Sequence, residues 1–338
     1  MKKIVTYGLL TVFLYACGNS KISIENSQNI VFEYDQNQPL NYGDTLSVAF
    51  YNVNLGGEKI DISGSHQLTV YGESINYNQR EKLLSIDKRP TQRDVDELLF
   101  YTVIKEKGDS VVYPQKIKLD FSGELKVNLK GESGDVGRGR LPRLRPVLLS
   151  EGKTGKDADD GMDGEDGLKV RVHIWKEDEM YYLRAEDTIS GEVWYYQTTN
   201  KENILIDVSG GDGGNGGNGG SGSRGAKGKV TGDKSFSPGK GGDGSNGGDG
   251  GNGGNGGTVE VIVHENAQDV MASLTIINKG GLAGKGGEAG KPGKGGKGAP
   301  GQKDGEDGKP GEEGKDGMAG NDGEPPIIYI EDFDFKKW

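Results

Sequence analysis

A mainly β fold is predicted for this chain by three features of its sequence. Segments rich in Val, Ile, Tyr and Phe alternate with turn signals from residue 28 to residue 121, and similar segments recur after residue 168. Between the later segments lie runs in which glycine returns at every third place. We expect an N-terminal Ig-like β-sandwich, followed by a β-base that carries polyglycine-II fingers of Gly-X-X and Gly-Gly-X repeats.

The N-terminal strands form the first predicted domain, residues 28–125. Turn signals such as Gly56-Gly57 and Gly108-Asp109 separate them. The predicted strands cover residues 29–35, 45–53, 66–72, 98–105 and 110–121. About a hundred residues with short strands at this spacing are typical of a sandwich. Segment 86–98 is expected to be a loop, because Pro90 disfavours a helix there.

Composition limits the core and the class of partner. Hydrophobic residues, with glycine not counted, make up 32% of the 338 residues, whereas the usual fraction of about 45–50% includes glycine. The apolar residues are concentrated between residues 28 and 120 and in short islands afterwards, so the apolar core must be local. The formal net charge is −11 and the pI is about 5.0. These values argue against a general nucleic-acid binder.

The glycine-rich runs have a strict period of three. Their glycine positions advance in threes over residues 210–228, 241–256, 281–296 and 305–323, with a weaker earlier set over 152–167. A polyproline-type helix has three residues per turn, so glycine at this period lies along one edge. Such a rod makes no internal hydrogen bonds, and only bare backbone lets neighbouring rods come close enough to supply partners.

Three interpretations of the runs remain open. Glycine-rich segments are often flexible linkers. The segment "GEDGKPGEEGKDGMAGNDGEP" resembles bacterial collagen-like sequences and implies a trimeric triple helix. Against collagen, the chain has only 11 prolines and the repeat slips frame between Gly296 and Gly298. A packed bundle within one chain is favoured, because residues 210–228, 239–257 and 305–323 are equal in length.

Predicted strands bracket the runs in the second domain, residues 126–338. They cover residues 168–175, 192–199, 203–209, 258–265, 272–278 and 325–330. We expect three fingers, at 131–167, 210–257 and 280–323, with tip loops at 140–150, 229–238 and 299–304. The arrangement over 210–323 is similar to the glycine-rich adhesins at the tips of some phage tail fibres. That resemblance implies a sandwich of polyglycine-II helices whose far loops contact a surface.

The N-terminus has the features of a targeting segment. Lys2 and Lys3 precede an apolar stretch that is shorter than the roughly 20 residues needed to span a bilayer. Leu14-Tyr15-Ala16-Cys17 resembles the lipobox of bacterial lipoproteins. The resemblance implies a signal peptide over 1–16 and three acyl chains, including palmitate, on Cys17. An ordinary secretory signal is the alternative.

Lipidation at Cys17 would tie the mature chain to a membrane through a tether over 17–27. Gly18 stands where an inner-membrane retention aspartate is often found, so the cell outer membrane is favoured, with the periplasmic or surface face left open. Asp44-Thr45-Leu46 resembles the O-glycosylation sequon of Bacteroidetes. We therefore expect a Bacteroidetes-like lipoprotein.

No cofactor, metal or catalytic residue is predicted. Calcium-binding nonapeptide repeats need a large aliphatic residue two places after the aspartate, where these runs have glycine. His66, His173 and His264 lack metal-ligand spacing. No nucleophile has an identifiable base, so an enzyme is not expected. The Asp and Asn residues of the repeats are expected to form a solvated polar edge.

Two groups of residues are candidates for contacts. Arg138, Arg140, Arg143 and Arg145 alternate with apolar residues such as Leu144 and suit an anionic or amphipathic partner. The leucines could instead pack on the base. The second group is aromatic and consists of Trp175, Tyr181, Tyr182, Trp194, Tyr195 and Tyr196. Two strands with these residues are expected to form a core face, although exposed rings could stack on sugars.

The expected function is that of an outer-membrane-anchored structural or adhesive lipoprotein, whose finger tips meet another outer-membrane protein or a surface glycan. One alternative is an accessory subunit of an outer-membrane complex, and another is a trimeric collagen-like stalk. An enzyme acting on polysaccharide would need a carboxylate pair beside the aromatic strands, which the sequence does not place.

Overall fold

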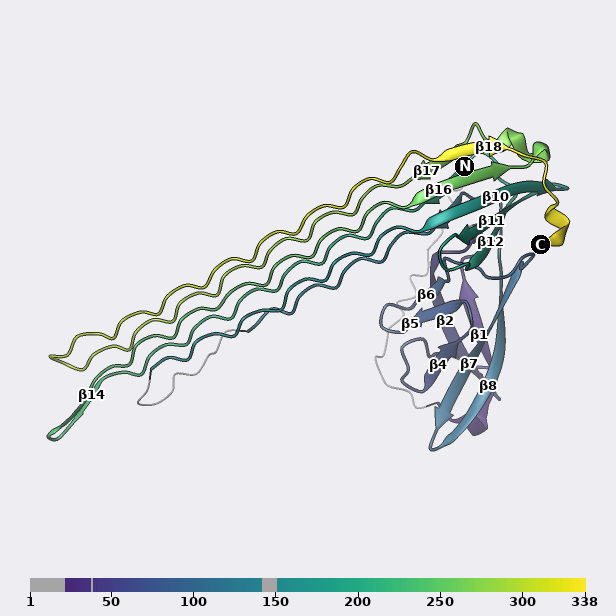
Figure 1. Ribbon diagram of the computed structural model, residues 1–338. Helices are drawn as coiled ribbons and strands as arrows, with labels where there is room; N and C mark the ends of the chain where they lie inside the picture. Colours follow the sequence, from purple (N-terminus) through teal and green to yellow (C-terminus); the bar gives the residue numbers. More distant parts are fainter. Residues whose placement is uncertain (1–21, 38, 142–150) are drawn as a thin grey trace, which may run out of the picture. The chain divides into compact units, whose positions relative to one another are not determined.

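The computed structural model describes residues 22–37, 39–141 and 151–338 (Figure 1). The chain divides into two compact units, each described by itself below. The first unit comprises residues 22–37, 45–86 and 97–118. The second unit comprises residues 39–44, 87–96 and 119–338. Strands are the main regular elements of both units and the helical elements are short 3₁₀ turns, so the mainly β class is confirmed.

The first unit contains two antiparallel sheets. One sheet has the order β1-β2-β6-β5, with β3 paired to β2, and the other has the order β4-β7-β8. The strands are β1 (Ser27–Tyr34), β2 (Thr45–Asn54), β3 (Lys59–Asp61), β4 (Leu68–Tyr71), β5 (Ile75–Asn78), β6 (Leu83–Ile86), β7 (Glu97–Glu106) and β8 (Asp109–Lys118). A short 3₁₀ turn, η1 (Ile24–Asn26), precedes β1.

Aromatic side chains join the two sheets of the first unit. Phe50 on β2 and Phe100 on β7 are fully buried, and their ring centroids lie 6.5 Å apart in an edge-to-face arrangement. Phe32 on β1 contacts Phe100 in the same manner at 5.1 Å. Buried residues alternate with more exposed ones in β2 and β7, as expected for strands with one face toward a core.

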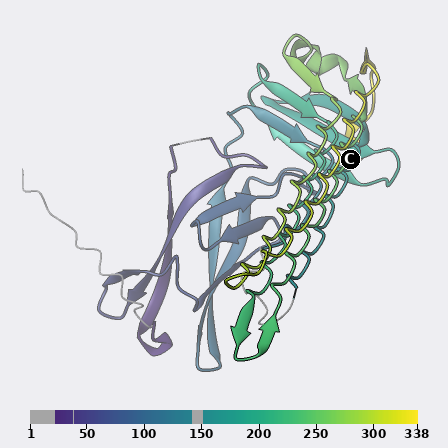
Figure 2. The ribbon, with the colours of Figure 1, turned by 90° about the vertical axis from the view of Figure 1, so that its left-hand side faces the viewer.

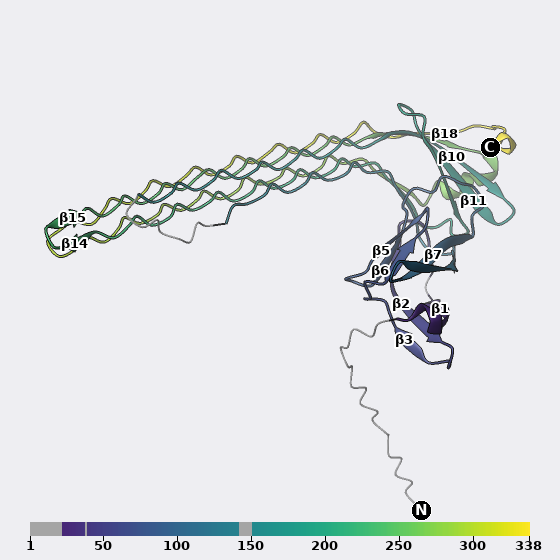
Figure 3. The same ribbon diagram turned by 90° about the horizontal axis from the view of Figure 1, so that it is seen from below.

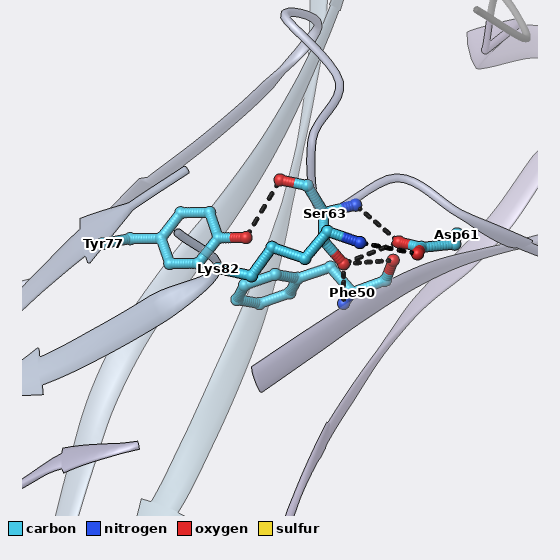
Figure 4. Close-up of polar contacts among 5 residues, drawn as sticks. All are labelled: Phe50, Asp61, Ser63, Tyr77 and Lys82. Carbon is cyan, nitrogen blue, oxygen red and sulfur yellow. Dashed lines mark hydrogen bonds and ion pairs between the residues drawn. The ribbon is translucent and has the colours of Figure 1, made fainter. Parts of the chain in front are cut away.

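A polar cluster ties the β3 end to neighbouring strands (Figure 4). The Ser63 hydroxyl donates to Asp61 and accepts from the Phe50 N–H, and Tyr77 donates to the Ser63 carbonyl. Burial by itself would raise the pKa of Asp61, but bonds from Ser63 and the Lys82 ammonium lower it overall. Burial and the nearby Asp61 charge raise the pKa of Tyr77 to about 12. The enclosed Ser63 hydroxyl thus serves as a structural link.

Besides a two-stranded hairpin, the second unit contains two sheets. A parallel sheet has the order β17-β13-β9, and a mixed sheet has the order β12-β11-β10-β16-β18. The strands are β9 (Leu125–Asn128), β10 (Lys169–Glu177), β11 (Met180–Asp187), β12 (Val193–Thr198), β13 (Ile204–Asp207), β16 (Thr258–Val263), β17 (Leu274–Ile277) and β18 (Ile327–Ile330). The remaining elements are β14 (Lys229–Thr231), β15 (Lys234–Phe236), η2 (Glu265–Val270) and η3 (Phe335–Lys337).

One apolar core lies between these two sheets. Val127 and Ile206 of the parallel sheet belong to the same fully buried cluster as Val172, Leu183 and Val261 of the mixed sheet. The η2 turn adds buried side chains to one side of the cluster. The core is therefore built by short strands that are far apart in sequence.

Two loops from the N-terminal part of the chain belong to the second unit. The predicted boundary at residue 125 does not follow the compact units, because residues 39–44 and 87–96 pack with the later strands. The Tyr196 hydroxyl donates to the Lys88 carbonyl, and the Arg89 guanidinium lies 5.4 Å from the Trp194 ring centroid. The loop predicted over 86–98 is confirmed over 87–96, whereas Ile86 ends β6 and Glu97 and Leu98 begin β7.

Six glycine-rich segments outside the strands continue these sheets as extended rods (Figures 1 and 3). We define rod A as 129–141, rod B as 151–168, rod C as 208–228, rod D as 237–257, rod E as 278–299 and rod F as 303–326. Strands β9, β13 and β17 lead into rods A, C and E, and rods B, D and F lead into β10, β16 and β18. The strand order of each sheet thus becomes the rod order of one layer.

Candidate functional site

The rods of one layer run parallel and are joined by main-chain hydrogen bonds at every third residue. In the A–C–E layer, the N–H of Gly213 donates to the Leu282 carbonyl and that of Gly216 to the Lys285 carbonyl, both at 2.8 Å. The B–D–F layer has the same pattern, with the Gly250 N–H donating to the Lys315 carbonyl at 2.8 Å. Each layer is therefore a sheet-like array of rods.

The two layers are joined by antiparallel bonds from a different glycine series. The Gly214 N–H of rod C donates to the Met162 carbonyl of rod B, and the Gly251 N–H of rod D donates to the Gly214 carbonyl, each at 2.8 Å. The Gly284 N–H of rod E then donates to the Gly251 carbonyl at 2.9 Å. Because the N–H groups of the rods donate to carbonyls of neighbouring rods, the main chain itself holds the bundle together.

Close approach explains why the inner series is mostly glycine, with Ser223, Ala226 and Ser245 as the exceptions in rods C and D. A Cβ placed on Gly214 or Gly251 would lie closer than 3.0 Å to a carbonyl of a neighbouring rod, a separation that real Cβ atoms essentially never show. A side chain there would push the rods apart and break their hydrogen bonds.

The amount of glycine follows the number of neighbouring rods. Rods C and D each bond to four other rods and have two glycines in most triplets. Rods A and F each bond to two other rods and have one glycine in most triplets. Gly-Gly-X and Gly-X-X therefore mark interior and edge positions of the bundle.

Rod B contains an internal test of this rule. Ala158 occupies a glycine position, and its N–H donates to the Asn246 carbonyl at 3.2 Å. The corresponding bonds of Gly155 and Gly161 measure 2.9 and 2.8 Å. One methyl group thus coincides with the longest bond of that series.

The Asp and Asn residues of the repeats have a structural task that the sequence analysis missed. Asp212 and Asn215 of rod C accept through Oδ1 from the N–H groups of Leu282 and Lys285 of rod E, each at 2.8 Å. Asp160 of rod B likewise accepts from the Asp249 N–H of rod D at 2.7 Å. The expected solvated edge is exposed, but its side chains also satisfy outward N–H groups that the glycine ladder leaves over.

The edge between rods E and F shows the same pairing in its sequence. Aspartates of rod F accept from glycine N–H groups of rod E in the pairs Asp322–Gly280, Asp316–Gly286, Asp307–Gly295 and Asp304–Gly298. In the same antiparallel register, Pro310 falls opposite Pro292, which has no N–H to satisfy. Bonds from the Lys279 ammonium and the Gly280 N–H lower the pKa of Asp322. An acceptor side chain on rod F therefore stands opposite residues of rod E that have an N–H to donate, and Pro310 stands opposite a residue that has none.

Two of the predicted tip loops lie together. The predicted tip loop 229–238 contains the β14–β15 hairpin, residues 229–236, which is nearest the viewer in Figure 2. The Gln302 side chain from the 299–304 turn donates to the Ser235 hydroxyl at 2.7 Å and to the Phe236 carbonyl at 3.2 Å. Val230 and Phe236 are 53% and 40% exposed, so the joined tip presents apolar side chains to solvent.

The predicted arginine contact site is described only in part. Arg140 donates to the Asp157 carbonyl and to the Asp159 carboxylate, so its guanidinium is engaged within the bundle. Arg138 is exposed, and its carbonyl accepts from the Asp159 N–H. Arg143, Leu144 and Arg145 lie outside the described residues, as does the predicted lipidation site, Cys17.

The aromatic strands form packed faces. Tyr181, Trp194 and Tyr196 belong to the buried core cluster, as expected for a core face, whereas Trp175 is buried outside that cluster and Tyr182 and Tyr195 are half-buried. The C-terminal segment covers one side, where Trp175 stacks on Phe335 at 5.8 Å between ring centroids.

His173 lies under the same C-terminal cover. Its ring centroid is 5.1 Å from that of Phe333 and 4.6 Å from that of Trp338. Burial, followed by repulsion from Arg184 and Arg171, lowers the pKa of His173 to about 4. The ring is therefore neutral at neutral pH and packs as a half-buried structural residue.

Two classes of site are missing from the part of the chain that the structure describes. No group of three or more His, Cys, Asp or Glu side chains there is arranged to hold a metal ion. Over residues 22–37, 39–141 and 151–338, no helix has the length and apolar character that a membrane span requires.

None of the protein families, curated proteins or solved structures compared with this chain matches it.

Proposed function

We propose that this chain is an outer-membrane lipoprotein with a structural or adhesive role, anchored through Cys17, whose rods present their tips to a partner or surface. In this proposal the first unit is an Ig-like sandwich and the rods are polyglycine-II helices. The observation that carries it is the joining of two tips through Gln302 at the far end of a cross-bonded bundle. A bundle fixed along its length can hold a small contact surface in place.

Two further observations support this choice. Glycine series in rods C and D find hydrogen-bond partners on other rods of the same chain, whereas a collagen trimer would need those edges for two more chains. Val230 and Phe236 expose apolar surface at the tip, where a contact residue is expected.

The adhesive role is tested with bacteria that display the full chain. We expect V230S/F236S to reduce retention of the cells on glass under flow, because it removes the apolar surface of the tip. The control L99S/V112S changes side chains that are 48% exposed in the first unit and should leave retention unchanged. Equal retention by both variants and the parent would contradict the tip as the contact surface.

The anchor is tested separately. Cys17→Ala should abolish incorporation of labelled palmitate and release the chain from the outer-membrane fraction, because no thiol remains for acylation. Continued labelling of the variant would refute lipidation at this residue.

A further inference from the structure

The two broad faces of the bundle differ in charge. We name the outward series of rods C and E the basic face and that of rods B, D and F the acidic face. The basic face carries Arg224, Lys227, Lys279, Lys285, Lys291, Lys294 and Lys297, with the carboxylates Asp212 and Glu288. The acidic face carries Glu151, Asp157, Asp160, Asp163, Asp166, Asp243, Asp249, Glu306, Glu312 and Glu324, with the lysines Lys240, Lys303, Lys309 and Lys315. The charges are thus separated between opposite layers.

Near the tips, main-chain hydrogen bonds hold the two rods of the basic face side by side. The N–H groups of Gly222, Gly225 and Gly228 on rod C donate to the carbonyls of Lys291, Lys294 and Lys297 on rod E. Arg224 and Lys227 lie in the same stretch of rod C, so cations of two adjacent parallel rods gather on one side of the bundle. All five of these cationic residues are exposed.

The lysines of rod E beyond Lys279 lack an ion-pair partner among the described residues. Across residues 22–37, 39–141 and 151–338, no carboxylate lies within ion-pair distance of Lys285, Lys291, Lys294 or Lys297. By contrast, Lys279 at the base end pairs with Asp322 at 2.6 Å. The unpaired charges therefore concentrate away from the base.

The spacing of the lysines is regular. With a rise of about 3.1 Å per residue, every third residue of a rod advances about 9 Å along a straight line. Lys291, Lys294 and Lys297 then form a row of fixed positive charges. Although the whole chain has a net charge of −11, a Debye length of about 8 Å at physiological salt lets this local charge govern contacts.

From this arrangement we propose that the basic face binds a linear acidic polysaccharide laid along rod E. A straight row of cations suits a stiff polymer whose carboxylates recur at regular intervals, because several ion pairs then form together. The face has no Phe, Tyr or Trp for stacking on nucleic-acid bases. Leu282 is its only large apolar residue, which does not suit insertion into a lipid surface.

The inference rests on the proposed function only because such a polymer would be met outside the cell. It assigns a partner class to the side of the bundle, whereas the adhesive proposal concerns the tip. The two fail independently: loss of tip adhesion appears in the flow experiment, and failure of the basic face appears in direct binding to purified chain.

The test uses the purified full chain in detergent, with polygalacturonate as the probe and neutral dextran as the control polymer. We expect saturable binding to polygalacturonate alone, weakening as salt is raised because bound counterions are released. The variant K291Q/K294Q/K297Q should bind about tenfold more weakly, a loss of about 1.4 kcal/mol. Its melting temperature should equal that of the parent, because the side chains are exposed.

A matched variant removes the same charge from the opposite face. K240Q/K309Q/K315Q should retain affinity within about twofold, since its lysines lie among carboxylates on the acidic face. Equal weakening of both variants, or unchanged binding by the first, would overturn the proposal. Binding of phosphatidylglycerol vesicles in preference to polygalacturonate would overturn it in favour of a lipid surface. Low-salt dimers lost only in K291Q/K294Q/K297Q, without polymer binding, would overturn it in favour of a second copy.

Discussion

The strand half and the rod half of the second unit are built on the same chain trace but held together differently. In β13 and just after it, Ile204, Ile206 and Val208 are buried and supply side chains to the core. From Gly210 to Gly220 the same path continues along rod C, where the buried positions are glycines bonded to other rods through the backbone. Apolar burial stabilises one half and dense main-chain bonding the other.

The comparison shows that a layered architecture does not require side chains in its interior. In the strand half, volume must be filled, so truncation leaves a cavity. In the rod half, volume must be kept empty, so addition of a methyl group causes the damage. Smaller side chains should therefore destabilise the strand half, and larger side chains should destabilise the rod half.

The largest expected effect is a truncation in the strand half. Ile206→Ala should lower the free energy of unfolding by about 2–5 kcal/mol, because Ile206 is fully buried in the core. Urea unfolding followed by tryptophan fluorescence measures this, since Trp175, Trp194 and Trp338 all lie in the second unit. Leu205→Ala on the opposite face of β13 is the control and should cost clearly less. Equal losses would mean that the buried face is assigned wrongly.

The matching enlargement in the rod half is Gly251→Ala. It should cost about 1–3 kcal/mol, because the new Cβ would overlap a carbonyl of rod B. Gly139→Ala is the control, since its Cβ would meet its nearest atom at 3.3 Å on an exposed part of rod A. The same urea experiment compares the two. A harmless Gly251→Ala would show that the rods are not in close contact.

Acid should weaken the strand half through His173. The unfolded chain protonates this group near pH 6.5, whereas the folded chain holds its pKa at about 4. The unfolded state therefore binds more protons between these values, so stability falls as pH falls from about 6.5 to 4. Allowing for partial exposure, we expect a loss on the order of 1 kcal/mol. Thermal melts across this range measure it, and His173→Gln should flatten the dependence; an unchanged slope would exclude His173.

The smallest expected effect is the loss of one side-chain acceptor in the rods. Asp160→Ala should cost about 0.5 kcal/mol and speed deuterium exchange at the Asp249 amide, because the exposed N–H loses its partner. Asp160→Asn retains Oδ1 and should restore slow exchange. If the asparagine variant exchanges as fast as the alanine variant, the side chain is not the acceptor.

Much of the second unit was predictable from local sequence. The segments around β10, β13 and β16 show β-branched and aromatic runs, and the glycine period marks each rod. The pairing of rods was not predictable, because it depends on strands such as β9 and β13 that meet only in the folded chain. The loop carrying Lys88 and Arg89 gave no local sign that it joins the second unit.

The candidate site was predicted less well than the fold. The joined tip depends on Gln302 reaching a hairpin across more than sixty residues of sequence, as its bond to Ser235 shows. The basic face could have been found by sorting each rod by position within the triplet, since Lys291, Lys294 and Lys297 share one position. Without knowledge that rods C and E adjoin, that sorting would not have gathered Arg224 with them.

The antiparallel register between rods constrains how this molecule can change in length over evolution. Each bond from rod F to rod E, such as Gly305 to Gly296 and Gly320 to Gly281, matches residues whose numbers change in opposite directions by three. An insertion tolerated in one rod must therefore be a whole triplet and must be compensated in its neighbours. The rods can lengthen only together, in increments of about 9 Å. The rods of related chains should therefore differ in length by matched multiples of three residues.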